Sequence, residues 1–151
     1  MLHNRTMPTG ALMPELVYED VAEACDWLCR VFGFTERWRA GNHRAQLAAG
    51  DCALVVMQTR IGGDGEPRGG MVHARAPGGA ISHGVMMRVP DVDTHYERAR
   101  AQGAQILDEP KDFPYGERQY NAVDLGGHHW TFSQSIADVA PEEWGGTSPT
   151  H

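Results

Sequence analysis

The stretch that decides the fold is DVAEACDWLCRVFG at residues 20–33, because a similar pattern is repeated at residues 91–103 as DVDTHYERARAQG. In each copy an aspartate is placed to cap the start of a helix and a glycine is placed to end it. Between these two ends, apolar residues recur at helical spacing along one face, most clearly at Val21, Leu28 and Phe32. The repeat therefore predicts two amphipathic helices in equivalent places of two similar halves.

Short extended segments surround each predicted helix. One apolar run precedes each helix, at residues 16–18 and 85–89, and alternating segments separated by glycine-containing turns follow it. The segments after the first helix are 34–40, 43–49 and 52–58, and those after the second are 104–108, 118–125 and 128–134. Each half thus predicts the order β-α-β-β-β, and the fold class is α+β with two βαβββ modules.

The chain as a whole, residues 1–151, is predicted to form a single domain. The first module covers 12–59, the second covers 82–135, and residues 136–151 form a C-terminal tail. Between the modules, residues 60–81 are rich in glycine and predict a linker or flap. A long segment of this kind inside a compact domain often has a function.

Composition excludes two classes of partner. The chain carries 13 Lys and Arg against 20 Asp and Glu, a net charge of −7, so it lacks the basic face that nucleic acid requires. No apolar stretch approaches the roughly 20 residues of a membrane-spanning helix, so no membrane partner is expected. The absence of a secretory signal pattern and the odd number of cysteines predict a cytoplasmic protein.

Several motifs occur together in the order expected of one known superfamily. They are YED at 18–20, WL at 27–28, FGF at 32–34, DVD at 91–93 and DLGGHHWTF at 124–132. In this combination the sequence resembles the vicinal oxygen chelate superfamily, which includes glyoxalase I, extradiol dioxygenases and bleomycin-resistance proteins. The resemblance implies a cupped mixed sheet around a shared pocket, with helices outside, and assembly as a homodimer.

Many members of that superfamily hold a divalent metal such as Fe, Mn, Ni or Zn in the cup. The positions that match the superfamily's metal ligands are occupied here by Met13, Val55, Gly84 and Thr131. None of these is a usual ligand for such metals, which prefer imidazole and carboxylate groups. We therefore expect no metal cofactor. The alternative is a shifted metal site built from His83, His129 and Glu15.

The expected pocket is lined by apolar side chains with a few polar groups, a mixture typical of small-molecule sites. Strand alternation and the position of the rim predict ten ligand-binding residues: Glu15, Arg44, Gln46, Met57, Met86, Arg88, Tyr115, Arg118, Tyr120 and His129. In the strand at 118–125, Val123 is assigned to the helix side, so that Arg118, Tyr120 and Ala122 are expected to point into the pocket. An ion pair of Arg118 with Glu15 or Glu117 is the alternative for that arginine.

The sequence favours a small-molecule-binding protein that needs no metal, for example one that sequesters a drug or a metabolite. The alternative is a metal-dependent lyase or dioxygenase that uses the shifted site. Whether the protein turns a substrate over stays open at this point, because the same fold serves both catalysis and plain binding.

Overall fold

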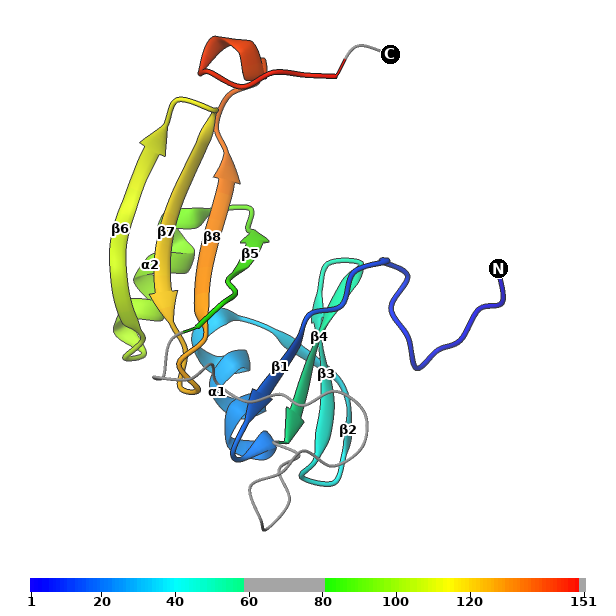
Figure 1. Cartoon of the computed structure of the whole chain (residues 1–151). Helices are drawn as coiled ribbons and strands as arrows, with labels where there is room; N and C mark the ends of the chain where they lie inside the picture. Colours follow the sequence, from blue (N-terminus) through cyan, green and yellow to red (C-terminus); the bar gives the residue numbers. More distant parts are fainter. Residues whose placement is uncertain (59–80, 150–151) are drawn as a thin grey trace.

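Two βαβββ modules follow one another along the chain, as predicted. The computed structural model describes residues 1–58 and 81–149 (Figure 1). The first module contains β1 (Glu15–Tyr18), α1 (Val21–Phe32), β2 (Thr35–Ala40), β3 (Arg44–Ala49) and β4 (Cys52–Gln58). The second contains β5 (Val85–Arg88), α2 (Val92–Ala101), β6 (Gln105–Phe113), β7 (Glu117–Val123) and β8 (His129–Ser135). A short 3-10 helix, η2 (Pro141–Glu143), lies in the tail, and the predicted linker lies outside the described residues except for Ile81.

Each module forms one four-stranded mixed sheet. The first sheet has the order β1-β4-β3-β2 and the second has the order β5-β8-β7-β6. In each sheet the opening strand of the module pairs in parallel with its last strand, and the other pairs are antiparallel. The predicted α+β class with two βαβββ modules is therefore confirmed.

The residues that were expected to start and end the helices do so at three of the four positions, whereas α2 ends at Ala101 with Gln102 as its C-cap, one residue before the expected Gly103. Asp20 and Asp91 cap α1 and α2, and their side chains accept hydrogen bonds from the backbone N–H groups of Glu23 and Thr94 at 3.0 and 3.1 Å. Gly33 ends α1 with φ of 80°, a left-handed conformation that glycine adopts without strain. None of the helices in the described part of the chain is long and apolar enough to cross a membrane.

Strand β6 is longer than the sequence predicts, because it continues through Pro110 to Phe113. Proline lacks a backbone N–H and is tolerated in a sheet only at an edge or a bulge. Both conditions hold here, since β6 is the edge strand of the second sheet and its pairing with β7 shifts between Asp108 and Lys111.

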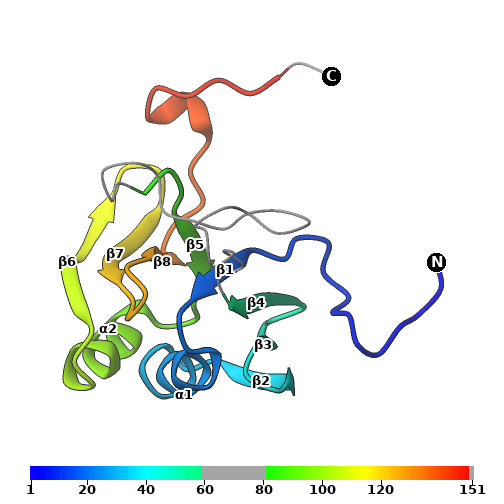
Figure 2. The ribbon, with the colours of Figure 1, turned by 60° about the horizontal axis from the view of Figure 1, so that its bottom comes forward.

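A single hydrophobic core joins the two modules on the side of the helices. Both helices lie on the same side of the two sheets, within the angle that the sheets make (Figure 2). Phe32 of α1 packs against Trp130 and Phe132 of β8, with ring centroids 5.5 and 4.8 Å away. Among the described residues, no helix lies on the opposite side of either sheet (Figure 2). We call these two surfaces the helix-free face of the first sheet and the helix-free face of the second sheet.

A buried carboxylate adds a polar link between the modules. Asp124 is 5% exposed and accepts hydrogen bonds from the Tyr18 hydroxyl at 2.6 Å and from the Trp130 indole at 3.0 Å. Its other oxygen accepts from the backbone N–H groups of Gly126 and His128. Desolvation by burial, followed by the nearby Asp124 carboxylate, raises the pKa of Tyr18 well above its ordinary value, so this hydroxyl keeps its proton as a donor.

Candidate functional site

The helix-free face of the first sheet contains the residues that strand alternation assigned to it. Gln46 of β3 pairs with Val55 of β4, and Val55 pairs in turn with Glu15 of β1, so these three side chains share one face. Arg44 and Met57 form the next pair on the same face. The predicted faces of β1, β3 and β4 are therefore confirmed.

This face combines buried apolar groups with polar ones. Val55, Met57 and Gln46 are 2%, 6% and 2% exposed. The Arg44 guanidinium lies 3.6 Å from the Glu15 carboxylate, and both side chains are about a third exposed. An exposed pair of this kind contributes little stability. It does fix the place of one cation and one anion beside the apolar groups.

Two donors on β2, neither of which was predicted from the sequence as a ligand-binding residue, extend this polar surface. Trp38 pairs with Gln46, and Arg37 donates to the Gln46 side-chain oxygen. Arg37 reaches this face because the β2–β3 register shifts between Glu36 and Trp38, which strict alternation cannot reveal.

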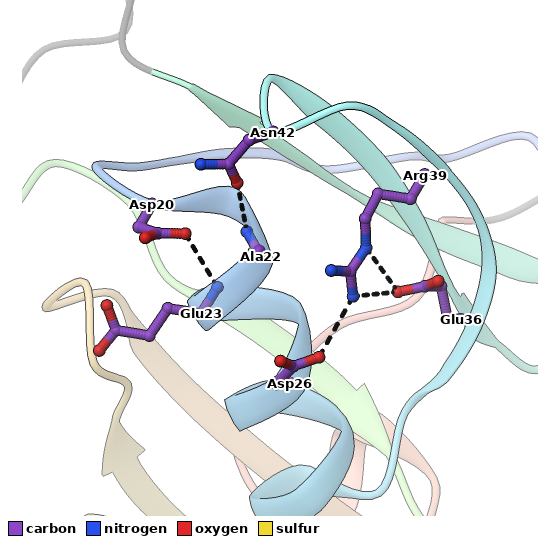
Figure 3. Close-up of polar contacts among 7 residues, drawn as sticks. All are labelled: Asp20, Ala22, Glu23, Asp26, Glu36, Arg39 and Asn42. Carbon is purple, nitrogen blue, oxygen red and sulfur yellow. Dashed lines mark hydrogen bonds and ion pairs between the residues drawn. The ribbon is translucent and has the colours of Figure 1, made fainter.

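The next arginine along β2 points to the opposite side. Arg39 contacts Asp26 of α1 and Glu36, with the Asp26 oxygen 3.2 Å away (Figure 3). The same close-up shows two bonds that hold the start of α1. Asp20 accepts from the Glu23 N–H, and Asn42 of the β2–β3 turn accepts from the Ala22 N–H at 2.7 Å. Arg37 thus lies on the helix-free face of the first sheet, whereas Arg39 lies on its helix side.

The predicted face of β7 is wrong. Tyr120 pairs with Phe132 and Ala122 pairs with Trp130, and both partners belong to the core on the helix side. Tyr120 is fully buried, its ring stacks on Phe132 at 5.2 Å, and its hydroxyl bonds to Nδ1 of His95 on α2. Tyr120 therefore does not lie on the helix-free face of the second sheet.

Arg118 follows Tyr120 to the helix side. Its guanidinium contacts Asp93 of α2 and Asp112 of β6, each at 2.9 Å. These two acids, rather than Glu15 or Glu117, are its ion-pair partners. The side chain also borders a shallow surface hollow between α2 and β6 with Tyr96, Glu97 and Glu109.

Because the two faces of β7 are the opposite of those predicted, Glu117 and Gln119 lie on the helix-free face of the second sheet. They belong to a chain of hydrogen bonds that starts at the Tyr115 hydroxyl, which donates to Gln119 at 3.0 Å. Gln119 donates to the Ser133 hydroxyl at 3.0 Å, and Ser133 donates to Glu117 at 2.7 Å. Hydrogen bonds from Ser135 and Ser133 lower the pKa of Glu117, so its carboxylate is held in the charged form.

The remaining predicted residues of the second module lie where strand alternation placed them. Met86 and Arg88 of β5 pair with Thr131 and Ser133, so they share the helix-free face. Met86 is 67% exposed. His129 opens β8 and is also exposed. The contribution of each of these residues to ligand binding stays a prediction.

Comparison with known proteins identifies the family. The family model of the Glyoxalase/Bleomycin resistance protein/Dioxygenase superfamily matches residues 10–132. The chain belongs to this superfamily. The crystal structure of TioX from Micromonospora sp. ML1, another protein of this fold, is 36% identical, with a TM-score of 0.66 over 84% of this chain and 99% of TioX.

Two further proteins are similar to this chain, one in sequence and one in fold. The uncharacterized protein Mb0911c of Mycobacterium bovis is 29% identical over 141 residues, which is 88% of each chain. The lactoylglutathione lyase of Agrobacterium tumefaciens is only 17% identical and shares the fold, with a TM-score of 0.61 over 84% of this chain and 94% of the lyase.

The four positions that were predicted to match the superfamily's metal ligands carry side chains that such metals rarely use. Val55 is an aliphatic side chain, and the Thr131 hydroxyl donates to Asn121 at 2.6 Å. Met13 and Gly84 offer neither imidazole nor carboxylate. Within residues 1–58 and 81–149, no three His, Cys, Asp or Glu side chains gather so that they could hold a metal ion.

The shifted metal site of the alternative prediction does not come together among these residues either. His83 lies against His128, with Nε2 3.2 Å from Nδ1, and Glu15 lies beside Arg44. His128 donates from Nε2 to the Val17 carbonyl at 2.8 Å, so its Nδ1 accepts in the neutral ring. Burial, with the nearby His128, lowers the pKa of His83. This histidine pair belongs to the junction of the modules.

Proposed function

We propose that the chain binds a small molecule on its helix-free faces, without a metal, and acts by sequestering a drug or a metabolite. The observation that carries the proposal is the helix-free face of the first sheet. There, buried Val55 and Met57 lie beside Gln46, Arg44 and Glu15, and the positions that hold metal in the superfamily carry no metal ligand. An apolar floor with a few directional polar groups favours binding of an organic molecule.

A second copy of the chain would complete this site. Within one chain the modules contact each other through the helices and the residues around Asp124, and the helix-free faces lie outside that contact. Closed pairs are the commonest assembly of identical chains. We therefore propose a homodimer in which the second sheet of one protomer faces the first sheet of its partner.

The oligomeric state can be measured by light scattering coupled to size-exclusion chromatography. We expect a dimer for the native protein and a shift toward monomer for Met86→Glu, which adds charge to the helix-free face of the second sheet. Ala101→Glu is the control, because Ala101 is exposed on α2, away from the helix-free faces. A native protein that stays monomeric at all concentrations would contradict the dimer.

Ligand binding can be tested by a thermal-shift screen of antibiotics, aromatic acids and divalent metals. A ligand that binds only the folded state raises the melting temperature by mass action, and a rise of several degrees at saturating ligand is expected for an organic compound. Arg44→Gln should reduce that rise, whereas Arg100→Gln, in a surface ion pair on α2, should not. Stoichiometric Fe, Mn, Ni or Zn in the purified protein, with loss of stability on chelation, would refute the metal-independent proposal.

A further inference from the structure

We propose that Arg37, Trp38 and Gln46 form a site for a ligand with consecutive carbonyl oxygens, such as an oligoamide. In the structure this site is filled by residues 5–7 of the chain itself, which such a ligand would displace. The inference rests on the proposed function, because it names the ligand chemistry that the helix-free face of the first sheet recognises.

The N-terminal segment folds back across the sheet before β1 begins. The Pro14 carbonyl accepts a hydrogen bond from the Val55 N–H at 2.9 Å, which places the end of the segment beside β4. Gly10 then lies against the β3–β4 turn, where its N–H donates to the Asp51 carbonyl. We call residues 1–14 the N-terminal arm. Figure 2 shows that the arm runs on the side of the first sheet away from α1.

Three backbone carbonyls of the arm meet the two donors of β2. The Trp38 indole donates to the Thr6 carbonyl at 2.9 Å. The Arg37 guanidinium donates to the carbonyls of Arg5, Thr6 and Met7 at 3.3, 3.3 and 3.2 Å. The arm thus binds here through its backbone, and the site recognises acceptor atoms rather than particular side chains.

One of the two donors, Arg37, also has a partner outside the arm. Gln46 is 2% exposed, and its side-chain oxygen accepts from the Arg37 guanidinium. Its amide nitrogen faces the Met7 sulfur at 3.9 Å, a weak contact that an oxygen acceptor would improve. Guanidinium and indole groups offer only donors, so a fitting ligand must supply acceptors in a row.

The arm is held weakly enough to be exchanged. Residues 5–7 are exposed, Met7 by 42%, so burial of apolar surface adds only in part to the hydrogen bonds of the arm. A ligand with the same carbonyls and a better-buried apolar group in place of the partly exposed Met7 side chain would gain apolar contacts that the arm lacks. Because a tethered arm acts at an effective concentration of roughly millimolar, it should weaken the binding of a free peptide about two-fold if the dissociation constant of that peptide is also about millimolar, and more if the peptide binds more tightly.

The test uses a peptide with the sequence of residues 3–10 as the probe, followed by the indole N–H signal of Trp38 in nitrogen–proton NMR spectra. Gly10→Val detaches the arm in the full chain, because a Cβ at Gly10 would lie 2.4 Å from the Cys52 sulfur and 2.6 Å from the Asp51 carbonyl. Thr9→Ala is the matched control in the same arm. A chain that lacks residues 1–9 is the second variant in case Gly10→Val folds poorly, and Trp38→Phe assigns the signal.

We expect the Trp38 indole hydrogen to exchange slowly in the native chain and in Thr9→Ala, and faster in the released variants. The peptide should bind the released variants and restore the slow exchange, and Arg37→Gln should abolish that binding while Arg39→Gln should not. Equal binding of the peptide to native and released chains would overturn the inference. So would fast exchange in the native chain, or a released chain that does not bind the peptide. These readouts are independent of the ligand screen, so either proposal can fail alone.

Discussion

Replacing Asp124 by asparagine tests the polar link that joins the two modules. The carboxylate accepts four hydrogen bonds, two at each oxygen, from Tyr18, Trp130, Gly126 and His128. Asparagine has the same shape but only one acceptor oxygen, so in either orientation its NH₂ group faces two donors. The substitution therefore removes two hydrogen bonds without creating a cavity.

The size of the effect follows from burial. Asp124 is 5% exposed, so water cannot easily replace the lost acceptor. A hydrogen bond to a charged group contributes about 1.5 to 3 kcal/mol, so the loss of two corresponds to about 3 to 6 kcal/mol. The Tyr18 hydroxyl can rotate away from the amide, so we expect the lower end, about 3 kcal/mol of the free energy of unfolding.

Urea unfolding followed by circular dichroism measures this difference, and a double-mutant cycle with Tyr18→Phe assigns it. In the native background, Tyr18→Phe should cost about 1 to 2 kcal/mol, because a donor to the carboxylate is lost. In Asp124→Asn, the same change should cost close to nothing, which gives a coupling of about 1 to 2 kcal/mol. Asp93→Asn, at an exposed partner of Arg118, is the control and should cost much less.

Two results would refute this reasoning. One is a loss below about 1 kcal/mol for Asp124→Asn, which would mean that the two donors find other partners. The other is an equal cost of Tyr18→Phe in both backgrounds, which would show that the hydroxyl and the carboxylate are not coupled.

Three further predictions concern the core and the junction. Burial lowers the pKa of His95 below 6.5, so the unfolded chain binds a proton that the folded chain does not. The free energy of unfolding should therefore fall as the pH drops from 6.5 toward the lowered pKa, and His95→Gln should flatten this dependence in urea titrations at several pH values. Burial raises the pKa of Cys25 to about 11, so in the native protein this thiol should react with a disulfide reagent far more slowly than the two partly exposed cysteines. Gly126→Ala should lower the melting temperature, because its Cβ would lie 2.7 Å from the Tyr18 ring, while Gly84→Ala, with 3.8 Å of room, should leave it unchanged.

The modules could be predicted from the sequence because their signals are local. Asp20 and Gly33 mark the ends of a helix whose apolar residues recur at helical spacing. The capping hydrogen bonds of both residues are made to partners within a few residues in the sequence. The faces of β3 and β4 followed in the same way. Leu47 and Leu54 are unambiguous apolar positions, and their alternation fixes the neighbours Gln46 and Val55.

The side of β7 that faces the core could not be predicted so simply, because both faces of this strand carry polar as well as apolar residues. One carries Arg118, Tyr120 and Ala122, and the other carries Gln119, Asn121 and Val123. The prediction took Val123 as the core residue and therefore assigned every side chain of β7 to the wrong face. Counting two apolar residues, Tyr120 and Ala122, against one would have given the observed face and brought Glu117 and Gln119 into the site.

The sequence by itself determined the two βαβββ modules and the aspartates that cap their helices. Only the tertiary structure decided what fills the helix-free face of the first sheet. The arm reaches Arg37 and Trp38 through backbone carbonyls across about thirty residues of chain, and the register shift in β2 turns Arg37 toward it. Backbone carbonyls are the same in every residue, so no pattern of side chains in the sequence could indicate that contact.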